Sequence, residues 1–155
     1  MAEVTQPPRP EMPDASAGFA LAELAAYYAL EKKAEAVVLL DLRGLSDVCD
    51  FFVIATGHAD VQVKAIARAV AVGLHRAGQD PVGSEGLESG RWALLDYVDV
   101  VVHVFRPEVR DYYQLERLWD DAPSLAITPD HLRGEGFRAR HGELPPSPDA
   151  AREST

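Results

Sequence analysis

The stretch WALLDYVDVVVHVF, residues 92–105, decides the fold. Two segments, 92–97 and 100–105, have the length and the apolar, β-branched and aromatic composition of strands. Only Val98 and Asp99 separate them, and that link is too short for a crossover. The two strands are therefore expected to pair as an antiparallel hairpin. The nearly uniform apolar character of 100–105 is typical of a central strand.

The residues on either side of this hairpin extend the pattern. Residues 81–86 are expected to form a short edge strand, because Pro81 is tolerated only at a sheet edge or at the start of a strand. Downstream, Pro107 occupies the position where the first residue of a helix would fall. Glu108 beside it favours the positive end of the helix dipole.

The upstream half predicts a helix over 18–34, strands over 35–42 and 51–55, and a helix from about 60 to 77. Asp60 is expected to cap the second helix. The order α-β-β-α-β-β-β-α then predicts one α/β domain with a mixed five-stranded sheet covered by helices.

Proline placement predicts the limits of that domain. Of the 11 prolines, only Pro81 and Pro107 fall within 19–121. We therefore expect a flexible N-terminal extension over 1–18, the α/β domain over 19–121, and a flexible C-terminal tail over 122–155. Both tails are expected to be dispensable for stability, although the apolar residues of 122–132 could fold back on the domain.

Composition narrows the function classes. The chain has 155 residues and a formal net charge of -10, which disfavours binding to nucleic acid phosphates and suits a basic protein partner. It has no apolar run as long as a membrane helix, and its N-terminus is neither basic nor apolar, so no signal peptide is expected. Cys49 is its one cysteine, so no internal disulfide can form. A cytoplasmic protein without membrane contact is expected.

Motifs for cofactor and metal chemistry are missing from the sequence. The five histidines do not fall at metal-ligand spacing, and the phosphate-binding, dinucleotide-binding and nucleophile-elbow motifs are absent. We therefore expect no cofactor, no metal and no catalytic residues. The alternative is a nucleotidyltransferase-like enzyme that uses Ser84, Asp96 and Asp99. The DxxD spacing disfavours it, because residues i and i+3 of a strand point to opposite faces.

Several blocks together carry a family resemblance. They are DLR at 41–43, DFFVIATG at 50–57, QV at 62–63, the hairpin at 92–105 and RDYYQLERLW at 110–119. In order and spacing they resemble the ribosomal silencing factors, also called Iojap-like proteins, over about residues 20–121.

The resemblance implies a fold and a function. The fold is similar to a nucleotidyltransferase core without catalytic residues. Such factors bind ribosomal protein L-fourteen on the large subunit and block joining of the small subunit, which represses translation when nutrients are limiting. The resemblance also implies a homodimer when the protein is free.

Candidate partner-binding residues lie in the hairpin and in the helix that follows it. Trp92 and Asp96 share one strand face, whereas Tyr97 lies on the other. The aromatic residues of this region could either pack the core or meet a partner, and the sequence leaves both alternatives open. The expected contact residues are Trp92, Asp96, Tyr97, Asp99, His103, Tyr113, Glu116 and Trp119.

Overall fold

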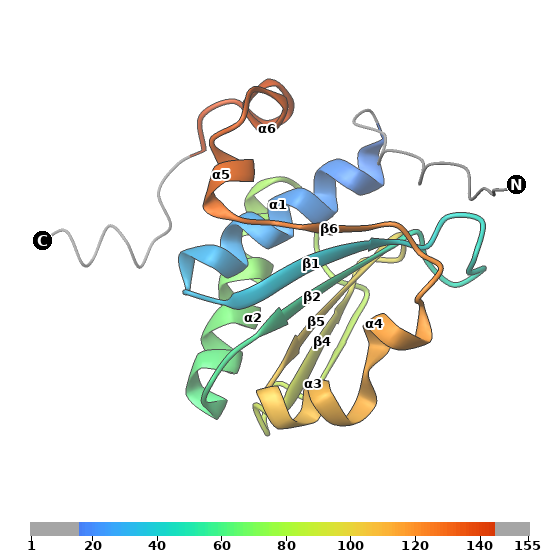
Figure 1. Cartoon of the computed structure of the whole chain (residues 1–155). Helices are drawn as coiled ribbons and strands as arrows, with labels where there is room; N and C mark the ends of the chain where they lie inside the picture. The colour runs from blue at the N-terminus through green and yellow to red at the C-terminus, as the bar shows by residue number, and fades with distance from the viewer. Residues whose placement is uncertain (1–15, 145–155) are drawn as a thin grey trace, which may run out of the picture.

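The computed structural model describes residues 16–144, and within them a mixed sheet of order β3-β4-β5-β2-β1-β6 lies between two sets of helices (Figure 1). The elements are α1 (Ala17–Glu31), β1 (Glu35–Asp41), β2 (Phe51–Thr56), α2 (Asp60–Arg76), β3 (Gly83–Glu85), β4 (Trp92–Asp96), β5 (Val100–Phe105), α3 (Pro107–Tyr113), α4 (Leu115–Leu118), β6 (Ser124–Ala126), α5 (Pro129–Leu132) and α6 (Glu135–His141). The predicted α/β class is confirmed, with six strands in place of five.

Strand pairing follows the predicted hairpin and adds a parallel pair. β4 and β5 are antiparallel, with Leu95 opposite Val102. β5 also pairs with β2 in parallel, and β2 pairs with β1 antiparallel. All six residues of β5 are buried, as expected for a central strand. β3 is an edge strand paired with β4, as Pro81 predicted.

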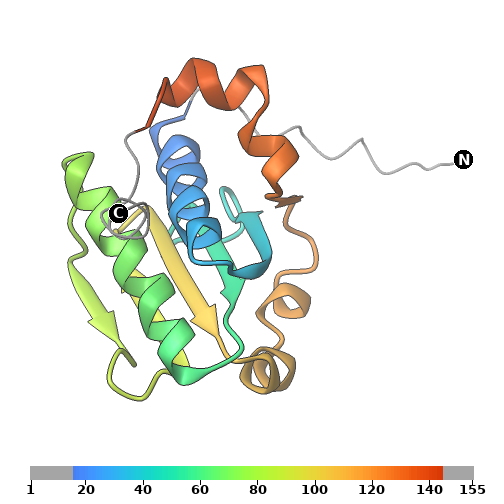
Figure 2. The same ribbon diagram turned by 90° about the vertical axis from the view of Figure 1, so that its left-hand side faces the viewer.

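The helices α1 and α2 lie side by side over one face of the sheet (Figure 2). They approach closely at Gly73 of α2, where an added Cβ would come within 2.3 Å of the Tyr28 ring of α1. Asp60 does not cap α2: the cap is Ala59, and the Asp60 carboxylate instead accepts a hydrogen bond from Arg106 at 2.7 Å. The apolar stripe of α2 packs on the sheet through Val63, Ile66, Ala67, Val70 and Leu74.

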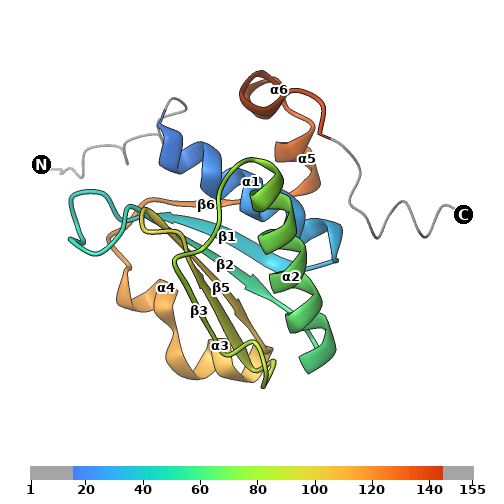
Figure 3. The ribbon, with the colours of Figure 1, turned by 180° about the vertical axis from the view of Figure 1, so that it is seen from behind.

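The opposite face of the sheet carries the short helices α3 and α4 (Figures 1 and 3). A second apolar cluster lies there, separate from the core beneath α1 and α2. Its buried members are Leu40, Leu42, Cys49, Ile54, Val101, Phe105, Val109 and Ala122, and its partly buried members include Phe52, Trp92, Leu94, Leu115 and Trp119. Several large side chains on this face therefore remain open to solvent.

The prediction of a flexible tail from residue 122 is wrong as far as residue 144. β6 extends the sheet by pairing antiparallel with β1, and α5 and α6 pack near α1. Glu23 of α1, which is completely buried, accepts hydrogen bonds from Arg140, His141 and His131. At the other end, α1 begins at Ala17 within the predicted extension 1–18. Residues 1–15 and 145–155 of the two predicted tails lie outside the described residues.

Candidate functional site

Strand alternation in β4 decides which predicted residues can meet a partner. Ala93 and Leu95 are buried toward α1 and α2, whereas Trp92, Leu94 and Asp96 are only half-buried on the opposite face. Trp92 and Leu94 thus belong to a surface that α3 and α4 cover incompletely. We call this surface the aromatic face and define it as Phe52, Trp92, Leu94, Tyr113 and Trp119.

Ring contacts connect the aromatic face across four elements. The centroid of the Trp92 ring lies 4.7 Å from that of Tyr113 in α3 and 4.8 Å from that of Phe105 in β5. Phe52 of β2 meets Trp119 edge to face, with 6.3 Å between centroids. Tyr113 is 51% exposed, whereas Phe52, Trp92 and Trp119 are partly buried, so the face is only partly open to water.

His103 lies beneath the aromatic face and is buried. Burial lowers the pKa of His103 to about 4, so its ring is neutral at physiological pH. Its Nδ1 accepts a hydrogen bond from Trp92 Nε1 at 3.1 Å, which places the ring proton on Nε2. That Nε2 atom has no hydrogen-bond partner within residues 16–144. His103 therefore supports Trp92 from below rather than presenting a charge at the surface.

The other predicted hairpin residues do not join the aromatic face as a group. Tyr97 lies on the α1–α2 side, where burial raises the pKa of its hydroxyl to about 12. Asp96 Oδ1 accepts a hydrogen bond from the Val98 amide, and Asp99 is exposed in the turn. Asp96 and Asp99 are consequently at the far end of the hairpin from Trp92.

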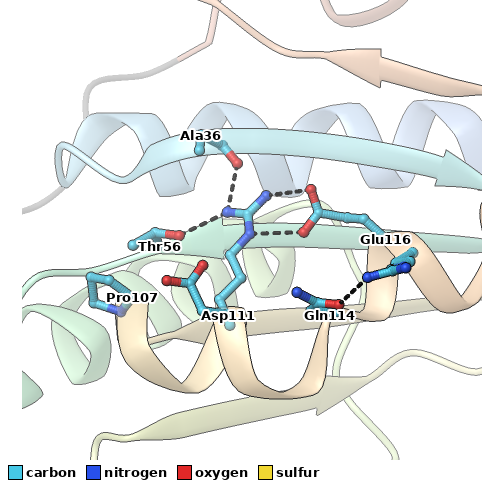
Figure 4. Close-up of a pocket in the computed structure, with 8 residues that line it drawn as sticks. Ala36, Thr56, Pro107, Asp111, Gln114 and Glu116 are labelled. Atoms are coloured by element: carbon cyan, nitrogen blue, oxygen red, sulfur yellow. Dashed lines mark hydrogen bonds and ion pairs between the residues drawn. The ribbon is translucent and has the colours of Figure 1, made fainter.

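Glu116 is held by a residue that the sequence analysis did not single out. Arg110 donates from Nε and Nη2 to the two carboxylate oxygens of Glu116, at 2.9 and 3.0 Å. Its Nη1 donates to the Ala36 carbonyl at 2.8 Å and to Thr56 Oγ1 at 2.7 Å (Figure 4). These residues line an open hollow of about 510 Å³ beside α3. The partners of Arg110 are up to 74 positions away, and no local spacing in the sequence signals them.

The residues of the catalytic alternative do not converge. Ser84 pairs with Leu95 across the β3–β4 ladder, so its side chain shares the face of Leu95 and not that of Asp96. No group of three metal-ligating side chains comes together in the part of the chain that the structure describes. In the same part, no helix has the length and apolar character needed to span a membrane.

Comparison with known proteins places this domain in a family. The family model described as "Ribosomal silencing factor during starvation" matches residues 14–152. The ribosomal silencing factor RsfS of Halalkalibacterium halodurans is 44% identical over 107 residues, which cover 69% of this chain and 92% of that protein. The RsfS of Chromobacterium violaceum is 49% identical over 96 residues, covering 61% and 79%.

Solved structures share the same fold. A crystal structure of a Chromobacterium violaceum protein, 45% identical in sequence, superposes with a TM-score of 0.64 and covers 70% of this chain and 91% of that one. The α/β fold with a partly uncovered sheet face is thus of a class already seen in solved structures. This chain belongs to the ribosomal silencing factor family.

Proposed function

We propose that this protein binds the large ribosomal subunit through ribosomal protein L-fourteen and blocks joining of the small subunit. By keeping the subunits apart it represses translation when nutrients are limiting. Family membership supports the ribosome as the partner. The observation that carries the proposal is the aromatic face, because it is the part of the molecule best suited to bind another protein.

The composition of the aromatic face is that of a binding hot spot. Tryptophan and tyrosine are enriched at the energetic centres of interfaces, where their large rings exclude water. Tyr113 is 51% exposed and Leu118 beside Trp119 is 72% exposed, so a partner could cover considerable apolar area here. Packing of α3 on the sheet does not by itself account for the 51% exposure of Tyr113.

Charge supports a basic partner. The chain carries a formal net charge of -10, and long-range attraction would speed its encounter with a basic ribosomal protein. We further propose that the protein acts in the cytoplasm, where subunits join, and that the free protein is a homodimer.

Cosedimentation with purified ribosomal subunits tests the proposal. Wild-type protein should travel with large subunits and not with small subunits, and it should reduce the fraction of joined ribosomes. Trp119→Ala should weaken both effects. Val61→Ala is the matched control, because Val61 is 77% exposed on α2, on the opposite side of the sheet.

Two results would contradict the proposal. If wild-type protein stays at the top of the gradient, the ribosome is not the partner. If it binds large subunits but Trp119→Ala binds equally well, the docking surface lies elsewhere. Direct binding to purified ribosomal protein L-fourteen distinguishes that protein from other sites on the large subunit.

A further inference from the structure

The segment 107–119, which we call the α3–α4 corner, has few apolar anchors. α3 fully buries Val109 alone, and α4 fully buries no residue. The two helices meet at Gln114, whose backbone is in the left-handed region with φ 48° and ψ 55°. A segment with so little buried apolar surface opens readily unless other contacts hold it.

Arg110 provides such contacts to three separate elements. From α3, its guanidinium reaches Glu116 in α4, Ala36 in β1 and Thr56 at the end of β2. The Arg110 side chain is 12% exposed, whereas the Glu116 side chain is 39% exposed, so the guanidinium is largely buried and its partners lie at the edge of the open hollow. The bidentate fork to a carboxylate is a geometry that lysine cannot reproduce.

The sheet is locally irregular at the point where Arg110 binds it. The β1–β2 register shifts between Glu35 and Val38, and Ala36 between them has φ 50°. A bulge of this kind leaves the extra residue out of the ladder. The Ala36 carbonyl is thereby available to accept the Arg110 bond.

Arg110 and Glu116, whose ion pair we call the clamp, each lie about one helical turn before an aromatic residue of the corner. Arg110 precedes Tyr113 by three residues, and Glu116 precedes Trp119 by three. Tyr113 and Trp119 in turn contact Trp92 and Phe52 on the strands. Joining Arg110 to Glu116 therefore fixes the distance and angle between the two turns that carry these rings.

We propose that Arg110 is a positioning residue for docking: it holds the α3–α4 corner against the sheet so that Tyr113 and Trp119 are already placed on the aromatic face before a partner arrives. This inference rests on the proposed function. Preorganisation of this kind improves affinity because the side chains are not ordered at the moment of binding.

Two variants of Arg110 and one matched control test the clamp. Arg110→Met keeps the aliphatic stem without its donors, and Arg110→Lys keeps the charge without the fork. Arg106→Met is the control, because Arg106 lies at the start of the same helix but pairs with Asp60 and Glu108. For each variant we would measure the Kd for large subunits, the thermal midpoint, and amide hydrogen exchange of the free protein.

The expected result combines a binding defect with a local change. Arg110→Met should weaken binding about tenfold, and Arg110→Lys should restore only part of the loss. Exchange should increase within 107–119 while β2 and β5 keep their protection. Arg106→Met should bind within about twofold of wild type, since an exposed ion pair contributes little.

Several outcomes would overturn the inference without affecting the proposed function. One is wild-type affinity in Arg110→Met. Another is loss of protection throughout the sheet, which would make Arg110 a general stability residue. If Arg110→Met does not fold, Glu116→Ala replaces it and should be non-additive with Trp119→Ala in binding; additive losses would contradict the clamp. If wild-type protein itself does not bind subunits, the proposed function fails instead.

Discussion

Trp92 Nε1 donates a hydrogen bond to His103 Nδ1 at 3.1 Å, and this contact joins β4 to β5 beneath the aromatic face. Leu94, not Trp92, is directly opposite His103 in the ladder, so the bond is diagonal. It fixes the orientation of the indole and the tautomer of the imidazole together. The half-buried indole of the aromatic face is therefore held by a buried neutral histidine.

Removing this donor should destabilise the fold by a moderate amount. Trp92→Phe leaves the buried Nδ1 of His103 without its donor, which should cost about 2 kcal/mol in the free energy of unfolding by urea. In a His103→Leu background the same change should cost about 1 kcal/mol less. Equal costs in the two backgrounds would show that the hydrogen bond contributes nothing.

Burial of His103 predicts a pH dependence of stability. Its pKa is lowered to about 4 in the folded protein, against about 6.5 when unfolded. The unfolded state therefore binds more protons between these values. The contribution of His103 to the free energy of unfolding is fully present above about pH 6.5. It is lost as the pH falls through about 4, for a total of up to about 3 kcal/mol. Urea unfolding at several pH values should show that the free energy of unfolding depends less steeply on pH in His103→Leu than in the wild type. The same pH dependence in both proteins would contradict the assignment.

The buried carboxylate of Glu23 should make α6 essential for stability. Burial raises the pKa of Glu23, but hydrogen bonds from Arg140, His141 and His131 outweigh it and hold the pKa at about 2. Arg140→Ala removes the bidentate partner and should cost about 3 kcal/mol, since a buried charge loses its main partner.

Arg138→Ala is the matched control for Arg140→Ala, because Arg138 is exposed on the same helix. It should change the free energy of unfolding by less than about 0.5 kcal/mol. A comparably small loss in Arg140→Ala would mean that α6 is not fastened through Glu23.

Tyr113 should affect binding more than stability. It is 51% exposed, so Tyr113→Ala should lower the melting temperature only slightly. If it is a hot spot worth about 2 kcal/mol, dissociation from large subunits should be about ten- to thirty-fold faster. Surface plasmon resonance gives the rates and thermal unfolding gives the control. A large loss of stability together with binding would make Tyr113 a core residue.

Salt should act mainly on association. Attraction between the acidic protein and a basic partner is screened over about 8 Å at about 0.15 M salt. The association rate should therefore fall as salt rises, while the dissociation rate changes little. Asp99→Asn in the exposed turn should slow association modestly if the turn faces the partner. Association that is insensitive to salt would show that apolar contact alone drives docking.

The sequence predicts the centre of this fold better than its edges. A two-residue link between strand-like segments requires the β4–β5 hairpin, and the α2 stripe requires an amphipathic helix. β6 has three residues, too few for a periodic signal, and it forms because β1 offers an open edge. Glu23 gives no signal inside an alanine-rich helix, since its partners come from more than a hundred residues away.

Prediction of the candidate site has the same limit, because contacts between distant residues leave no local signal in the sequence. The strand pattern separates Trp92 from Tyr97, and aromatic composition points to Tyr113 and Trp119. Which of these rings remain exposed depends on how far α3 and α4 cover the sheet. Arg110, which we propose positions these helices, makes long-range bonds to Ala36 and Thr56, and the bond to Ala36 is at a bulge that the sequence does not reveal.

The placement of the indole rings provides an optical reporter. The chain contains two tryptophans, and both Trp92 and Trp119 belong to the aromatic face. Tryptophan fluorescence, excited selectively over tyrosine, therefore reports on this surface. Covering the rings with a partner removes water dipoles from around them, which should shift their emission to shorter wavelength. Docking can thus be followed on the unlabelled protein, with a spectral change that comes from the contact itself.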